Sequence, residues 1–154
     1  MNYAIVLRLL SYILLTEGAL LLLPAVASLC YGEWFVMGVF LFTAALSALA
    51  GALFHRVKAK SQIFYMREGF VTTALCWLLI SVVGAVPFVL TGCIPNPVDA
   101  LFETVSGFTT TGASILPAVA DLPKGILFWR SFTHWVGGMG VLVFLLSLLP
   151  LTGG

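Results

Sequence analysis

The sequence predicts an all-α membrane protein with four transmembrane helices, and with a shorter re-entrant helix and loop between the third and the fourth. Of the 154 residues, 61% are hydrophobic and only 8% are charged, and the mean hydropathy is +1.13. Soluble domains carry about 25% charged residues, so this chain lacks the polar surface of a soluble protein. Four segments have the roughly 20 mainly apolar residues that a crossing needs, and the region between the last two is too mixed. These segments are residues 3–29, 34–54, 69–90 and 126–149.

The positive charges orient these segments. The loop between the second and third segments holds four of the seven Lys and Arg residues, and the positive-inside rule places it in the cytoplasm. Four crossings then put both ends of the chain on that side. The chain therefore divides into a transmembrane hairpin (1–54), a cytoplasmic basic loop (55–68) and a helix–loop–helix unit (69–154). The basic residues of the loop are Arg56, Lys58, Lys60 and Arg67.

The hairpin contains two features of note. In its second helix, Ala44/Ala48 and Ser47/Gly51 have small-xxx-small spacings, which either let helices approach closely or are ordinary apolar filler. In its first helix, Glu17 is the one acid in an apolar run, and acids inside membranes are costly and often functional. We expect Glu17 to face a protein partner, with cation binding as the alternative.

Four aromatic residues near the predicted outer ends suit a membrane-interface belt, although Trp135 fits a deeper position too. They are Tyr31, Trp34, Trp129 and Trp135.

The re-entrant helix begins at a capping sequence. Asn96 can cap, Pro97 suits the first helical position, and Asp99 complements the N-terminal dipole. Gly107 is a natural stop. About ten residues at about 1.5 Å each span roughly 15 Å, which is half of a hydrocarbon core of about 30 Å. This helix is therefore long enough to enter the membrane halfway and too short to cross it.

The loop after this helix has the composition of an ion-binding strand. Thr109, Thr110 and Thr111 add hydroxyl oxygens, and Gly112 permits backbone angles that turn successive carbonyls to one side. A ring of such carbonyls can replace the hydration shell of K⁺, and the negative helix C-terminus also favours a cation. The alternative is a threonine-rich outer loop in which Gly112 only makes a turn.

The fourth predicted helix carries glycines and an arginine whose roles each allow more than one interpretation. Its glycines, Gly137, Gly138 and Gly140, each cost about 1 kcal/mol of helix propensity, which makes sense if another backbone, such as the loop, approaches closely. General small-residue packing is the alternative. Arg130 has the reach to pair with Glu103 or Asp121, or to extend to the membrane surface.

Ser131 and His134 are three residues apart on one helical face, as in a nucleophile–base pair of a hydrolase. Because no oxyanion motif or orienting acid lies nearby in the sequence, we predict that the chain is not an enzyme. His134 is then a packing residue or a residue of an outer vestibule.

Two long blocks, DALFETVSGFTTTGAS (99–114) and LFWRSFTHWVGGMG (127–140), resemble the first pore repeat of the Trk/Ktr/HKT family of potassium transporters, and most closely its bacterial Trk members. The resemblance implies K⁺ uptake across the bacterial inner membrane, with no organic cofactor and no nucleic-acid partner. In that family four such units surround one pore. The family's key filter glycine falls on Gly112, with carbonyl donors at Thr109, Thr110, Thr111 and Ala113, and K⁺ at Thr110, Thr111 and Gly112. Asn96, Asp99 and Glu103 then support the pore helix.

The resemblance also implies partners beyond this chain. One pore loop cannot surround an ion, so three further pore repeats are required, together with membrane lipid and, by family resemblance, a cytoplasmic nucleotide-binding regulatory subunit. We expect the chain to be part of a longer four-repeat transporter. The alternatives are a short form that assembles as a homotetrameric cation channel, and a non-conducting structural or regulatory remnant.

Overall fold

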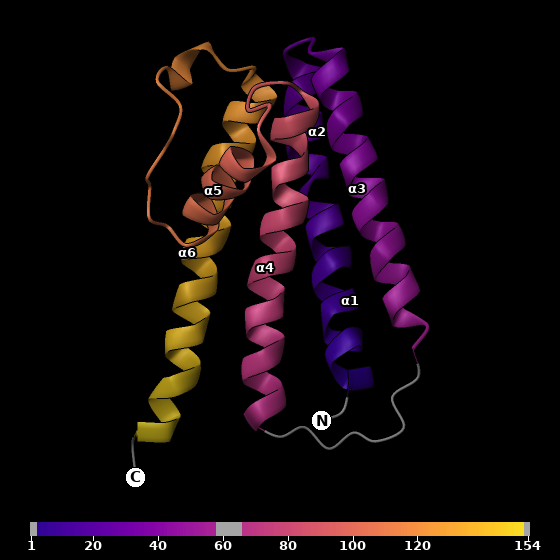
Figure 1. Ribbon diagram of the computed structural model, residues 1–154, viewed down its shortest axis with the longest axis vertical. Helices are drawn as coiled ribbons and strands as arrows, with labels where there is room; N and C mark the ends of the chain where they lie inside the picture. The colour runs from indigo at the N-terminus through magenta and orange to yellow at the C-terminus, as the bar shows by residue number, and fades with distance from the viewer. Residues whose placement is uncertain (1–2, 58–65, 153–154) are drawn as a thin grey trace.

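The computed structural model describes residues 3–57 and 66–152, and no strand occurs among them. Long helices run side by side, and the shorter α5 lies next to the first half of α6 (Figure 1). The start of α1 and the end of α6 lie at one end of the molecule, and η1 lies at the other. The elements are α1 (Tyr3–Leu20), α2 (Leu22–Cys30), α3 (Trp34–His55), α4 (Met66–Leu90), α5 (Pro97–Phe108), the 3₁₀ turn η1 (Val119–Asp121) and α6 (Lys124–Thr152).

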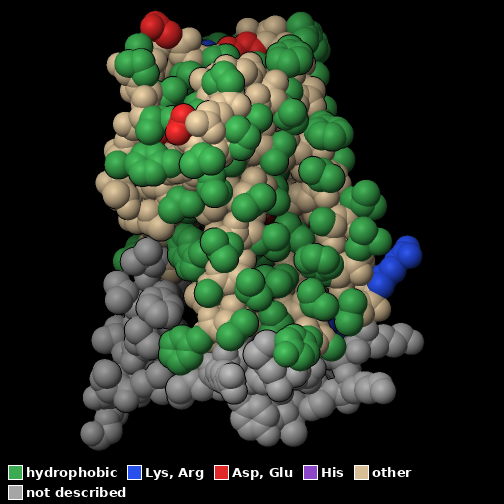
Figure 2. Space-filling view, viewed as in Figure 1, with side chains coloured by type: hydrophobic (Ala, Val, Ile, Leu, Met, Phe, Trp, Pro, Cys, Tyr) green, Lys and Arg blue, Asp and Glu red, His purple; other side chains and the backbone are tan. Residues whose placement is uncertain are grey.

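Three stretches of the described residues are helical, long and apolar enough to span a bilayer: Tyr3–Cys30, Trp34–His55 and Gly69–Leu90. This finding confirms the predicted all-α membrane class. The fourth predicted segment, 126–149, lies within α6. The sides of the molecule carry many exposed apolar side chains, while acidic side chains gather near the end that holds η1 (Figure 2). Most of the predicted basic loop, Lys58 and Lys60 included, lies outside the described residues.

The first predicted segment, 3–29, forms one candidate span, Tyr3–Cys30, whose helix is interrupted at a single residue. The break falls at Leu21, between α1 and α2. Pro24 is the cause, because proline has no N–H to donate to the carbonyl of Leu20 and its ring crowds that carbonyl. The chain still continues in nearly the same direction, so α1 and α2 together form one span of 28 residues.

Small residues bring α1 and α3 into close contact, as the spacings in the second helix predict. The Ser47 hydroxyl donates a hydrogen bond of 2.7 Å to the Leu14 carbonyl of α1. A Cβ added to Gly51 would lie 3.1 Å from the Ser11 carbonyl oxygen, and one added to Gly18 would lie 3.1 Å from that of Ala44. The hairpin is therefore held by direct backbone-to-backbone approach.

Trp129 is the centre of the core, which corrects its predicted place in an interface belt. It is 1% exposed, and its indole N–H donates a hydrogen bond of 2.9 Å to the Gly84 carbonyl of α4. Its ring meets Phe40 of α3 and Phe108 of α5 edge to face. One side chain of α6 thus joins the hairpin to the end of the short helix. Tyr31, Trp34 and Trp135 are each more than 60% exposed.

Candidate functional site

The short helix α5 is built by its N-terminal sequence. The Asn96 side chain accepts a hydrogen bond of 3.0 Å from the Val98 amide, Pro97 takes the first helical position, and Asp99 lies in the first turn. These residues satisfy an open amide and complement the helix dipole. With 12 residues, α5 is about 18 Å long, which is too short to cross a hydrocarbon core of about 30 Å.

The helix ends at Phe108, one residue beyond the predicted stop at Gly107. Gly107 serves a different purpose, because a Cβ there would overlap the Thr133 hydroxyl of α6. The absent side chain lets α5 lie directly on α6. Gly107 therefore contributes close packing and not chain reversal.

The loop that follows is tightly turned back on the helix. Thr110 has a φ of 57°, a left-handed angle that is rare for a β-branched residue, and Gly112 has a φ of 76°. The Ser106 carbonyl accepts a hydrogen bond of 3.0 Å from the Thr111 amide, and the Gly107 carbonyl accepts one of the same length from Thr110. The backbone of α5 thus fixes the turn through the amides, which leaves the loop carbonyls available.

The carbonyl oxygens of residues 109–112 accept no hydrogen bond from any residue that the structure describes. The Ala113 carbonyl differs from them, because it accepts a hydrogen bond of 2.6 Å from the Ser106 hydroxyl. The hydroxyls of Thr109 and Thr111 lie 2.8 Å apart and bond to each other. The loop therefore offers a run of open backbone oxygens, bounded on its far side by a carbonyl that is tied to the helix.

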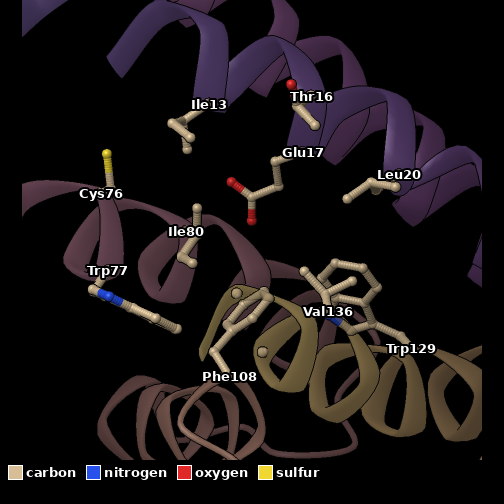
Figure 3. Close-up of a pocket in the computed structure, with 12 residues that line it drawn as sticks. Ile13, Thr16, Glu17, Leu20, Cys76, Trp77, Ile80, Phe108, Trp129 and Val136 are labelled. Carbon is tan, nitrogen blue, oxygen red and sulfur yellow. The ribbon is translucent and has the colours of Figure 1, made fainter. Parts of the chain in front are cut away.

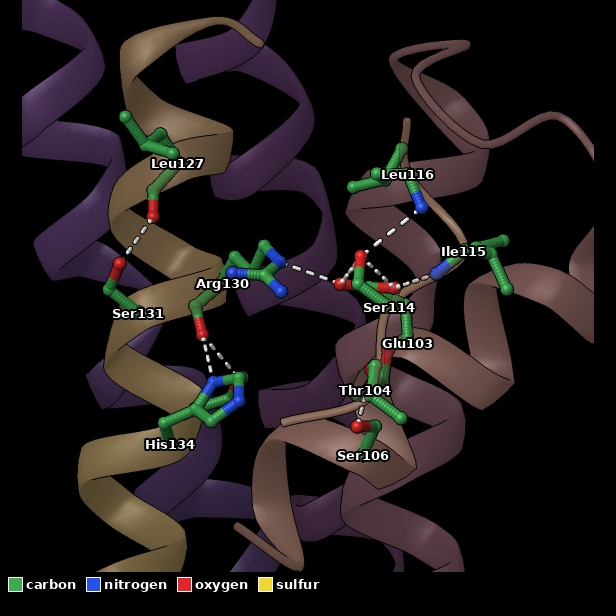
Figure 4. A network of polar contacts seen from close by, with 12 residues as sticks. Glu103, Thr104, Ser106, Ser114, Ile115, Leu116, Leu127, Arg130, Ser131 and His134 are labelled. Carbon is green, nitrogen blue, oxygen red and sulfur yellow. Dashed lines mark hydrogen bonds and ion pairs between the residues drawn. The ribbon is translucent and has the colours of Figure 1, made fainter. Parts of the chain in front are cut away.

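Glu103 holds the extended segment that leaves the loop. Its carboxylate is buried, with a side chain 1% exposed, and accepts hydrogen bonds from the Ser114 hydroxyl at 3.0 Å and the Ile115 amide at 3.2 Å (Figure 4). Arg130 of α6 donates to the same carboxylate at 2.6 Å. Three donors, two from residues 114–115 and one from α6, thus converge on one acid of α5. A buried charge with this many partners fixes the positions of the elements that supply them.

Arg130 therefore pairs with Glu103, which settles the choice among its predicted partners. Its neighbours do not form the hydrolase pair. The Ser131 hydroxyl donates to the Leu127 carbonyl at 3.1 Å, and His134 Nδ1 lies 2.9 Å from the Arg130 carbonyl. Each polar group is satisfied within α6 and not by the other, so the nucleophile–base contact is not made.

Gly137 lets α6 pack closely against Phe108, the residue just before the loop. A Cβ there would overlap the carbonyl group of Phe108, whereas Gly138 and Gly140 meet only side-chain atoms at 3.8 Å, from Thr110 and Trp77. The three glycines thus differ in kind. At Gly137 the backbone of Phe108 is too close for any side chain, whereas a Cβ would fit at Gly138 and at Gly140.

Glu33 is a structural acid that the sequence reasoning did not single out. It lies in the turn between α2 and α3, yet its carboxylate accepts hydrogen bonds from the amides of Lys124 at 2.7 Å and Gly125 at 3.0 Å. These are the first amides of α6, which an acid stabilises. The residues are about 90 positions apart in the sequence, so no local pattern could have found this cap.

Comparison with known proteins agrees with this geometry. A family model, TrkH, described as a cation transport protein, matches residues 36–154. The chain is 36% identical to a cation transporter of Methanocaldococcus jannaschii over 96% of its length, and 33% identical to the Trk system potassium uptake protein TrkH of Halomonas elongata over 99%. It is 34% identical to TrkG of Escherichia coli over 84%.

The chain spans about a third of the length of these curated relatives, with 31%, 32% and 27% of each covered. The family match nevertheless takes in more than half of the chain, including α5, the loop and α6. Transporters of this family are not enzymes. The chain is a multi-pass membrane protein and belongs to the TrkH family of cation transport proteins.

Proposed function

We propose that the chain supplies one of the four filter loops of a K⁺ uptake pathway. The observation that supports this best is the run of open carbonyl oxygens at residues 109–112, directly after a helix of half-membrane length. Carbonyl oxygens can take the place of water around K⁺. The relatives named as potassium uptake proteins support K⁺ as the ion.

In this proposal α5 is a re-entrant pore helix. The span formed by α1 and α2, together with α3, α4 and α6, makes four crossings, with both chain ends and the basic loop in the cytoplasm. The three parts are then the hairpin 1–54, the loop 55–68 and the pore unit 69–154. The C-terminal end of α5 carries partial negative charge, which would favour a cation near the membrane centre. K⁺ would lie at the carbonyls of Thr110, Thr111 and Gly112.

Each supporting residue has a distinct task in this arrangement. Asn96 and Asp99 stabilise the start of the pore helix, and Glu103 with Arg130 holds the outgoing strand. The Ala113 carbonyl, which already accepts a hydrogen bond from Ser106, would have one remaining lone pair for an ion. Gly137 lets α6 lie against the loop.

One loop cannot enclose an ion, so the proposal requires three more. They are either further repeats of a longer chain or copies of this one. The plasma membrane of a bacterium is the proposed location, and a cytoplasmic nucleotide-binding ring is the proposed regulator. A second candidate function, a non-conducting structural subunit, predicts specific association with transporters and no ion flux.

The test is to change the filter glycine. In the assembled transporter, reconstituted in vesicles, we expect Gly112→Val to reduce the preference for K⁺ over Na⁺ by at least about tenfold, because valine is strained at a positive φ. The measurement is ion flux with each cation. Gly92→Val is the matched control, since Gly92 has the same φ of 76° and, like Gly112, has no atom within 4 Å of an added Cβ.

If Gly112→Val transports with unchanged selectivity, the filter assignment is wrong. If Gly92→Val changes selectivity equally, the effect comes from general backbone strain and the assignment also fails. The mass of the purified assembly distinguishes a homotetramer from a longer single chain.

A further inference from the structure

A partly open cavity of about 230 Å³ lies next to the end of α5 and is lined mainly by α1, α4 and α6 (Figure 3). Its walls are almost wholly apolar, with Ile13 and Leu20 on α1, Ile80 on α4 and Val136 on α6. Phe108, the last residue of α5 before the loop, also lines the cavity. The cavity is therefore separate from the loop carbonyls but shares a side chain with the helix that carries them.

One titratable side chain faces this space. Glu17 is only 4% exposed, and neither of its carboxylate oxygens has a hydrogen-bond partner among the described residues. The side chain extends from α1 into the cavity toward Ile80 and Phe108 (Figure 3). The nearby Thr16 hydroxyl is already committed, since it donates to the Tyr12 carbonyl at 2.8 Å. Ionising a buried carboxyl group without a partner is costly, so a cation that binds beside Glu17 would stabilise its ionised form.

Aromatic rings form much of the remaining wall. Trp77, Phe108 and Trp129 all line the cavity. The indole N–H of Trp129 is taken by the Gly84 carbonyl, so Trp129 presents no donor of its own to a ligand. Aromatic faces attract organic cations, and the attraction is strongest where water is excluded.

We propose that this cavity binds a small organic ammonium with an apolar body, with the charged nitrogen at Glu17 and the body against the aromatic wall. The size fits, because a cavity of about 150 Å³ holds benzene and this one is larger. An inorganic cation fits poorly, because it needs several oxygen ligands and Glu17 is the only acid among the described residues that line the cavity. This inference does not depend on K⁺ transport.

The experiment uses phenethylammonium as the probe and neutral 2-phenylethanol, of nearly the same shape, as its control. The protein is held in nanodiscs of zwitterionic lipid, and binding is followed by tryptophan fluorescence, since Trp77 and Trp129 line the cavity. We expect saturable binding of the ammonium, weakened at least about tenfold by Glu17→Gln. The alcohol is expected to bind both forms alike. Asp121→Asn, which removes an exposed acid on the outer turn, should leave the affinity unchanged.

A second variant tests the place as well as the charge. Ile80→Trp would fill the cavity while keeping the carboxylate, and we expect it to abolish saturable binding. Circular dichroism and gel filtration report whether each variant is folded. The proposal is overturned if the wild-type protein shows no saturable binding, if Glu17→Gln binds phenethylammonium as tightly as the wild type, or if folded Ile80→Trp binds it unchanged.

Discussion

Two buried acids, Glu103 and Glu17, are almost equally hidden, with 2% and 4% of their surface exposed, yet their surroundings are opposite. Glu103 accepts hydrogen bonds from Arg130, Ser114 and Ile115. Glu17 has no partner among the described residues and faces an apolar cavity. Burial alone therefore does not tell what an acid does in a membrane protein. Glu103 has the environment of a brace, and Glu17 that of a binding site.

The largest expected effect comes from removing the brace. Glu103→Leu would leave the Arg130 guanidinium without its partner and the donors of Ser114 and Ile115 unsatisfied, so we expect the free energy of unfolding to fall by about 3–5 kcal/mol. Denaturant titration of the protein in detergent, monitored by circular dichroism, measures this loss. An unchanged unfolding midpoint would show that the ion pair does not hold the loop.

The same substitution at the other acid should act in the opposite direction. Glu17→Leu replaces an unpartnered carboxyl with an apolar side chain of similar volume in an apolar cavity, so we expect the free energy of unfolding to rise by about 1–2 kcal/mol. The same titration without added ammonium provides the measurement. A loss of stability as large as that of Glu103→Leu would erase the contrast between the two sites.

A third substitution, with a smaller expected effect, tests what the Ser114 hydroxyl contributes to holding Glu103. Ser114→Ala removes one hydroxyl from Glu103 but keeps the Ile115 amide and Arg130, so we expect a loss of about 1 kcal/mol. Ser131→Ala is a suitable control, because that exposed hydroxyl bonds only within α6. If both changes have the same effect, the clamp on the strand is not specific.

Local patterns predicted much of this fold and part of the site. The start of α5 followed from Asn96 and Pro97, and the close helix pair in the hairpin followed from the spacing of Ser47 and Gly51. Both predictions use residues that lie within one or two turns of a single helix. The break at Leu21 could also have been predicted, because Pro24 is visible in the sequence.

What the sequence could not predict depends on contacts between distant segments. The sequence suggested that Trp129 is an interface residue, because tryptophan near the end of a spanning segment suits one, but residues of α3, α4 and α5 surround it. The hydrogen bond from Ser106 to Ala113, and the lack of a partner for Glu17 among the described residues, depend on the path of the folded chain. Such contacts form only in the folded chain, so no local motif or hydrophobic periodicity in the sequence predicts them.

The cap that Glu33 places on α6 has a consequence for the order of assembly. Chains are synthesised from the N-terminus, so the turn that carries this acid is in place before α6 emerges. The first amides of α6 then meet a carboxylate that is already positioned, about 90 residues after it was made. We therefore expect the hairpin to act as a template against which α6 docks.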